Sequence, residues 1–99
     1  MIVVSGTIRV APGSSEAAKV AMIAVGAETR KEDGCMTYAF HADLTEEGAF
    51  RVFEEWESDE ALKAHSQAPH MTVFREKLAS LEFISREIKR YRVSETSTL

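Results

Sequence analysis

The fold is decided by residues 50–78, which read FRVFEEWESDEALKAHSQAPHMTVFREKL. The first seven residues of this stretch follow the two-residue period of a β-strand, and Ser58 can then cap a helix. Pro69 disfavours helical geometry at the residue before it but suits the first position of a new helix. We therefore expect one strand followed by two short helices, the second ending near Ser80. Folding them back on one another would bury four apolar side chains: Phe53, Leu62, Phe74 and Leu78.

The segment before this stretch predicts one strand and one helix. Residues 2–10 alternate, and the members of one face are Val4, Gly6, Ile8 and Val10. After a Pro-Gly turn, the pattern predicts a helix over about residues 15–32, stopped by Gly34. The apolar stripe expected on this helix has helical spacing and consists of Val20, Ile23, Ala24 and Ala27.

Three further alternating segments complete the expected sheet. Residues 35–42 place Met36, Tyr38 and Phe40 on one face, and residues 49–56 follow after a polar loop that ends in glycine. These two segments together predict a β-hairpin. Residues 84–93 alternate well enough for a fourth strand, with Ile84 and Ile88 on the same face.

This order of elements predicts an α+β, ferredoxin-like βαββαβ fold, in which a four-stranded antiparallel sheet carries the helices on one face. The other face of the sheet would present Val3, Thr7, Thr37, Ala39, Ala49, Arg51 and Phe53. Such a face is too apolar to be fully exposed to solvent and too polar to form the core of a monomer. We therefore expect a homodimer in which two sheets face each other.

Length, composition and charge limit which classes of protein the chain can belong to. The 99 residues, 44% apolar and 28% charged, predict a single domain over residues 1–93 and a flexible tail over residues 94–99. No segment approaches the length of a membrane span, and the N-terminus lacks the basic region of a signal peptide. Because the lone Cys35 also fits a reducing compartment, we expect a cytoplasmic protein without a membrane partner. The net charge of −4, with dispersed basic residues, argues against a nucleic-acid partner.

Two histidines are the main candidates for chemistry. On the first short helix, His65 follows the apolar spacing of Leu62 and should point toward the sheet, where a neutral imidazole could take a proton near neutral pH. The alternative is a histidine at the edge of the core that bonds a backbone carbonyl. His70 lies beside the helix break, so it is a candidate for substrate binding or, alternatively, for bonding the loop.

Aromatic and acidic side chains could complete a site around His65. Trp56 ends its strand where the chain turns toward the helices, so it could form the wall of a cleft, and Tyr38 could supply a phenol to the same cavity. Both could equally be core residues. Glu54 and Glu55 point to opposite faces of the strand, so one of them must face inward. An inward carboxylate needs a partner, and the sequence offers Arg51, Arg86 and His41.

The sequence lacks the spacings of common metal and cofactor sites. His65 and His70 are five positions apart across Pro69, and there is no His-x-x-x-His or Cys-x-x-Cys pair. There is also no glycine-rich phosphate loop, which argues against a dinucleotide. We therefore expect no metal and no cofactor, and chemistry that needs only protons, shape and a bound substrate.

Three short motifs connect the chain with a known family. Residues 32–38 read EDGCMTY, residues 53–62 read FEEWESDEAL, and Ala64-His65 precedes Pro69-His70-Met71. Together they resemble the antibiotic biosynthesis monooxygenase (ABM) domain over nearly the whole chain. The patterns Gly-Cys-x-x-Tyr, Glu-x-Trp-x-Ser and His-x-x-x-Pro-His are especially similar to the small quinol monooxygenase branch. The resemblance implies a dimeric α+β barrel and an oxidation without a cofactor.

The resemblance also implies a substrate and residue roles. The substrate would be an electron-rich phenol or hydroquinone that reacts with dioxygen. His65 would accept or orient the proton, Trp56 and Phe74 would be aromatic walls, and Tyr38 would donate to a substrate oxygen. The haem-degrading and anthrone-oxidising members use an asparagine, whereas this chain has none and offers only Gln67. Haem is therefore not expected.

Three hypotheses of function remain at this point. The first is a cofactor-independent monooxygenase of quinol-like aromatics. The second is a non-catalytic dimer that sequesters a small aromatic or lipid. The third is an isomerase or lyase for a small polar metabolite, which would need a wetter pocket with an Arg or His at a phosphate or carboxylate. The aromatic residues expected around the site count against the third hypothesis.

Overall fold

The computed structural model describes all 99 residues and confirms the predicted α+β, ferredoxin-like arrangement. Its elements are β1 (Ile2–Val10), a 3-10 turn η1 (Pro12–Ser14), α1 (Ser15–Thr29), β2 (Cys35–Ala42), β3 (Ala49–Trp56), α2 (Asp59–Ser66), α3 (Pro69–Ser80) and β4 (Phe83–Arg92). The strands form one antiparallel sheet in the order β2-β3-β1-β4. The helix break expected at Pro69 is present, and Ser58 Oγ accepts a hydrogen bond from the amide of Ala61. None of the helices is long and apolar enough to span a membrane.

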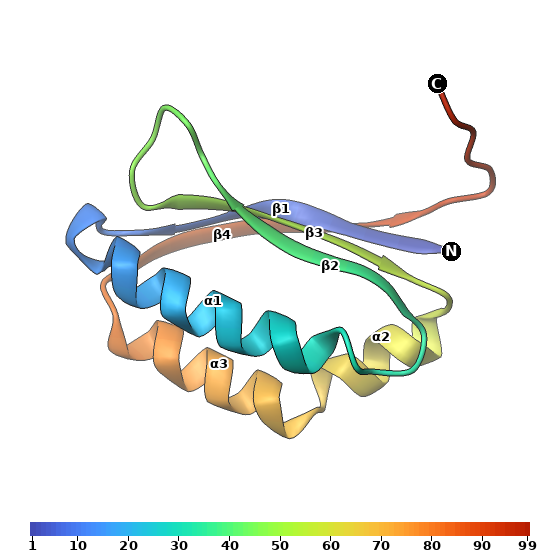
Figure 1. Ribbon diagram of the computed structural model, residues 1–99, viewed down its shortest axis with the longest axis horizontal. Helices are drawn as coiled ribbons and strands as arrows, with labels where there is room; N and C mark the ends of the chain where they lie inside the picture. The colour runs from blue at the N-terminus through green and yellow to red at the C-terminus, as the bar shows by residue number, and fades with distance from the viewer.

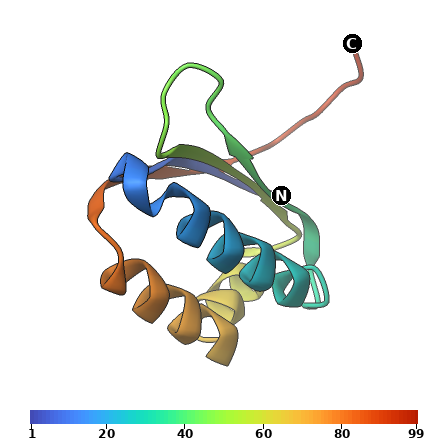
Figure 2. The same ribbon diagram turned by 60° about the vertical axis from the view of Figure 1, so that its left-hand side comes forward.

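The molecule has two layers. Figure 1 shows α1, α2 and α3 on the same side of the sheet, and Figure 2 shows that no helix covers the opposite side. We call the helix-covered side the inner face and the uncovered side the outer face. The division follows from the alternation of β1, whose inner side chains are buried while the outer ones are partly exposed. The predicted buried face of β1 is therefore confirmed.

The core lies between the inner face and the helices. The central strand β1 contributes Ile2, Val4, Ile8 and Val10, and the neighbouring β3 contributes the fully buried Trp56. Gly6 lies between these apolar residues of β1, where a Cβ atom would stand only 2.1 Å from the backbone oxygen of Glu87 on β4. Glycine at this position therefore allows β1 and β4 to approach closely.

The prediction that the apolar stripe of α1 consists of Val20, Ile23, Ala24 and Ala27 is wrong. Val20 and Ile23 are 69% and 72% exposed. The buried face of α1 consists instead of Ser15, Ala18, Met22, Val25, Gly26 and Thr29. Apolar or small side chains occupy most sides of this helix, so two faces with helical spacing compete, and the face that contains Met22 and Val25 is the buried one. The helix also ends at Thr29, three residues before the expected Glu32.

Two strands contain irregularities that alternation alone does not predict. In β2 the register shifts between Cys35 and Thr37, so Met36 is exposed and Cys35 shares the inner face with its partner Trp56. In β4 the register shifts opposite Arg9 and Val10, which leaves Ile84 exposed and unpaired between Phe83 and Ser85. These are β-bulges, each of which adds one residue to one strand. The predictions that Met36 shares a face with Tyr38 and Phe40, and that Ile84 shares a face with Ile88, are therefore wrong.

Phe53 is a further correction. It pairs with Ser5 of β1 and Ala39 of β2 on the outer face and is exposed there. The helices therefore do not bury it, contrary to the expectation from residues 50–78. Phe74 is buried, whereas Leu62 and Leu78 pack against the core and are partly buried.

Candidate functional site

Two histidine side chains from different helices contact the same carboxylate oxygen, which belongs to Glu32. Oε2 of Glu32, in the turn between α1 and β2, lies 2.7 Å from Nδ1 of His65 on α2. The same oxygen lies 2.7 Å from Nε2 of His70 in the first turn of α3. The side chains of His65, Glu32 and His70 are 5%, 16% and 22% exposed. We call these three residues the Glu-His-His cluster.

Local backbone features bring this cluster together. Gly34 has φ +83°, and a Cβ atom there would stand 2.5 Å from Cβ of Ala61, so only glycine lets α2 pack this closely against the turn that carries Glu32. The Gly34 carbonyl also accepts the amide of Glu57 at 2.9 Å. The helix break at Pro69 then places His70 on a new helix, on the other side of the same carboxylate.

The hydrogen bonds of the cluster define the tautomer of His65. A carboxylate oxygen accepts hydrogen bonds, so Nδ1 of His65 is the donor to Oε2 of Glu32. Burial lowers the pKa of His65, although the contact with Glu32 opposes this effect, so the ring is neutral near neutral pH. Nε2 then carries a lone pair and makes no hydrogen bond within the protein, and His65 belongs to the lining of the neighbouring cavity.

A cavity of about 210 Å³ lies between the inner face of the sheet and the α2–α3 pair. Its lining includes Tyr38, Phe40, Glu54, His65, Phe74 and Arg86. The centroid of the Tyr38 ring lies 5.3 Å from that of His65, and the Phe40 and Phe74 centroids lie 5.8 Å apart. Trp56 is fully buried with its ring centroid 4.7 Å from that of His65, so it supports the imidazole from behind.

Tyr38 lines this cavity, and its phenol keeps its proton. Burial, together with the negative charge of Glu54, raises the pKa of the phenol far above its ordinary value. The phenol therefore stays protonated over the working pH range of most proteins. It could donate a hydrogen bond to a ligand oxygen, but it is not a base.

Glu54 is the inward-facing carboxylate that the strand pattern required. Its Oε1 accepts a hydrogen bond of 2.9 Å from the indole Nε1 of Trp56. The partner predicted among Arg51, Arg86 and His41 is therefore wrong, because none of them bonds this group and Arg86 acts on it only as a nearby charge. Burial raises the pKa of Glu54 to about 7, while the indole hydrogen bond opposes this rise. Glu55 lies on the outer face and accepts the hydroxyl of Thr37 at 2.5 Å.

Glu54→Gln is expected to flatten the pH dependence of stability. Between the ordinary pKa of 4.5 and the folded value of about 7, the folded chain keeps a proton that the unfolded chain releases. The free energy of unfolding of the wild type should therefore fall by about 3 kcal/mol as pH rises through this window, and stay low above it. Urea unfolding at pH values on both sides of the window measures the effect. Parallel pH profiles for wild type and variant would contradict it.

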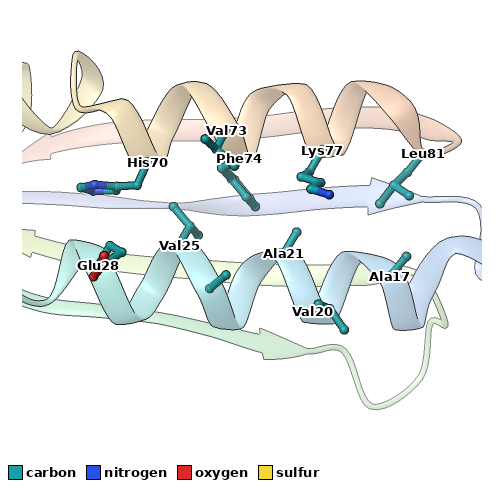
Figure 3. A pocket seen from close by; sticks show the side chains of 11 residues that line it. Ala17, Val20, Ala21, Val25, Glu28, His70, Val73, Phe74, Lys77 and Leu81 are labelled. Atoms are coloured by element: carbon teal, nitrogen blue, oxygen red, sulfur yellow. The ribbon is translucent and has the colours of Figure 1, made fainter.

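Figure 3 shows a second depression, a groove between α1 and α3. Its volume is about 550 Å³, and its lining is mostly apolar, with Val20, Val25 and Val73 among its residues. His70 and Glu28 lie at one end of the groove, on α3 and α1 respectively (Figure 3). The structure thus places His70 at the groove rather than in the cavity that holds Tyr38, His65 and Phe74.

The comparison with known proteins connects this geometry with a family. Residues 1–77 match the family model described as antibiotic biosynthesis monooxygenase. The chain belongs to this family. The predicted ABM membership is therefore confirmed, although the matching model does not distinguish a quinol monooxygenase branch.

This ABM chain is also similar to several individual proteins. The uncharacterized protein sll1783 of Synechocystis is 39% identical over 99% of this chain and 67% of its own length. The structure of PA3566 from Pseudomonas aeruginosa is 31% identical, with a TM-score of 0.85 over 94% of both chains. A structure from Deinococcus radiodurans named for the ABM family is 25% identical, with a TM-score of 0.93 over 100% of this chain and 98% of its own.

Sequence reasoning missed one central residue of this ABM protein. Glu32 stood inside the motif EDGCMTY, but its partners are 33 and 38 positions away, so no local spacing indicates the contact. The ligand atoms of the Glu-His-His cluster all lie within 4.8 Å of one another, a set that the search for sequential metal motifs could not detect. The one local signal was Gly34, a turn glycine two positions after Glu32.

Proposed function

We propose that the protein is a cofactor-independent monooxygenase that oxidises a small electron-rich aromatic, such as a hydroquinone, with dioxygen. The observation that supports this most is the free Nε2 of the neutral His65 at a cavity lined by aromatic side chains. A base in such a site needs no cofactor, because the deprotonated substrate is itself the reductant for dioxygen.

Each cavity residue has a role in this reaction. A hydroquinone hydroxyl gives its proton to Nε2 of His65, and Glu32 stabilises the resulting imidazolium through Nδ1. Tyr38 donates a hydrogen bond to a substrate oxygen, and Phe40 and Phe74 hold the ring and exclude water. The substrate supplies all the electrons that dioxygen accepts. One oxygen atom enters a ring carbon and the other leaves as water, so a hydroquinone and dioxygen give a hydroxyquinone and water.

The size of the cavity favours small substrates. Its volume of about 210 Å³ is below the about 300–1,000 Å³ that is usual for sites of drug-sized ligands. A one-ring or two-ring hydroquinone fits such a space better than a polycyclic aromatic does.

The decisive experiment measures oxygen uptake with a graded panel of reduced quinones that have one, two and four rings. We expect uptake above the rate of spontaneous oxidation for the one-ring and two-ring substrates, and none for the four-ring substrates. Isotopically labelled dioxygen should place one labelled atom in the product. No uptake across the panel would refute the proposal, and calorimetric binding of a quinone without turnover would favour the sequestering dimer.

The cations of the cavity disfavour an isomerase or lyase that acts on a small anion. Arg75 donates a hydrogen bond of 2.6 Å to the backbone oxygen of Ser66. Arg86 lies close enough to Glu54 for its charge to act on that carboxylate. Arg75 therefore has a protein acceptor, and the carboxylate of Glu54 would repel a second anion near Arg86, which supports the oxidation over the third hypothesis.

We also propose that the protein is a homodimer that pairs through the outer face of the sheet. This face carries the exposed Phe53 of β3 and Tyr91 of β4, on opposite sides of β1. Val3 of β1 lies between these two strands, and Ala39 of β2 pairs with Phe53. An uncovered face of this composition is typical of an interface between two copies. Light scattering at micromolar concentration should give twice the mass of the chain, and the mass of a monomer would refute the proposal.

A further inference from the structure

We propose that Glu32, His65 and His70 form a binding site for a divalent late transition-metal ion, with Zn²⁺ as the reference ion. The inference does not depend on the oxidation proposed above. It rests on the type of the three ligand groups, their separation and the route from solvent.

Each of the three residues offers one ligand atom for a metal ion. Nδ1 of His65, Nε2 of His70 and a carboxylate oxygen of Glu32 all lie within 4.8 Å of one another. Two imidazoles and one carboxylate are the protein ligands of many catalytic zinc sites and of non-haem iron sites, where further positions stay open for water. An ion would replace the two N–H protons that now point at the same oxygen.

An ion would need both N–O contacts to open slightly and the two imidazole nitrogens, now up to 4.8 Å apart, to move closer together. Two ligand atoms at about 2.05 Å from an ion lie about 2.9 Å apart at a right angle and about 3.3 Å apart at a tetrahedral angle. The present N–O distances are both 2.7 Å. Each contact must therefore open by a few tenths of an ångström, and Glu32 lies in a turn outside the regular elements, where such a shift is accommodated most easily.

The surroundings support an ion at this position. The ring of His65 is held by Trp56 and Tyr38, at centroid distances of 4.7 Å and 5.3 Å, so one ligand is fixed before the ion arrives. His70 lines the open groove between α1 and α3 and gives the ion a route from solvent (Figure 3).

The ligand set selects among ions. Imidazole nitrogen is a borderline ligand that suits Zn²⁺, Ni²⁺, Co²⁺ and Cu²⁺, whereas Mg²⁺ and Ca²⁺ prefer oxygen ligands throughout. We therefore expect binding of Zn²⁺ and Co²⁺ and no binding of Mg²⁺ at the same concentration.

Isothermal titration of Zn²⁺ into protein freed of any histidine tag tests the site. We expect one ion per chain, and at least a tenfold loss of affinity in each of His70→Ala and Glu32→Gln. His41→Ala is the matched control, because His41 is exposed at the end of β2 and should leave the affinity unchanged. Co²⁺ should add visible absorption bands that the two variants lack.

Two outcomes would overturn the inference. One is the absence of Zn²⁺ binding to the folded wild type, and the other is equal affinity in wild type, His70→Ala and Glu32→Gln. Circular dichroism on each variant excludes loss of fold as the cause of a lower affinity. A metal on Nδ1 would also keep the only ring proton of His65 on Nε2, so Zn²⁺ should inhibit oxygen uptake. This last readout alone rests on the proposed function, so the titration remains decisive if no substrate is turned over.

Discussion

His65→Ala is expected to lower kcat for oxygen uptake by about 100- to 10,000-fold, the range that removal of a general base typically gives. Nε2 of His65 is the only unprotonated side-chain nitrogen that the structure places at the cavity, and the phenol of Tyr38 is held in its protonated form. The other group at the cavity that can take a proton near neutral pH is Glu54, whose pKa is about 7 and whose Oε1 already accepts the Trp56 indole, so it accounts for the residual rate of the variant. KM should change much less than kcat, because the aromatic walls that bind the ring remain.

Added imidazole provides a sharper readout for the same variant. The alanine leaves a gap beside Trp56 that free imidazole can occupy, so part of the rate should return as the imidazole concentration increases. His41→Ala is the matched control, and it removes an exposed imidazole from the end of β2. An unchanged rate in His65→Ala, with circular dichroism like that of the wild type, would refute the role of His65 as the base.

Gly6→Ala is expected to destabilise the fold by about 3 kcal/mol or more, the upper range for an overpacked core. The added methyl carbon would stand 2.1 Å from the backbone oxygen of Glu87 and 2.4 Å from Cα of Ile88. Both obstacles are backbone atoms of β4, so no side chain can rotate away to make room. The central strand β1 and the edge strand β4 must then separate along their shared hydrogen bonds.

Gly13→Ala is the matched control for this prediction, because no atom lies within 4 Å of a Cβ built at Gly13. Its effect should stay within about 0.5 kcal/mol, as for most surface substitutions. Urea unfolding of both variants against the wild type gives the two differences in free energy. Equal stability of Gly6→Ala and Gly13→Ala would contradict the proposed close approach of β1 and β4.

The fold was predictable where the local signals agreed with one another. The alternation of β1, the cap at Ser58 and the break at Pro69 each indicated one structure, and each is present. The face of α1 was not predictable, because this helix is rich in alanine and valine on several sides and the packing depends on which side fits the sheet. The bulges at Met36 and Ile84 likewise depend on pairing with β3 and β1, which a single strand does not encode.

The candidate site was predictable only in part. The helical spacing indicated that His65 points toward the sheet, and the strand period required one inward carboxylate, which is Glu54. The partners of both groups come from other elements. Glu32 reaches His65 and His70 across the turn at Gly34, and the Trp56 indole reaches Glu54 along its own strand. These contacts follow from the tertiary arrangement and not from any local pattern.

The two β-bulges affect how residue roles can be transferred between this chain and its relatives. Because Met36 and Ile84 are extra residues, deleting either would leave its neighbours in regular alternation, with Cys35 and Tyr38 still inward in one strand and Phe83 and Arg86 still inward in the other. A relative that is one residue shorter in either strand can therefore keep the same cavity. In a sequence alignment the gap belongs at Met36 or Ile84, and a gap placed a few positions away would pair cavity residues with outer-face residues.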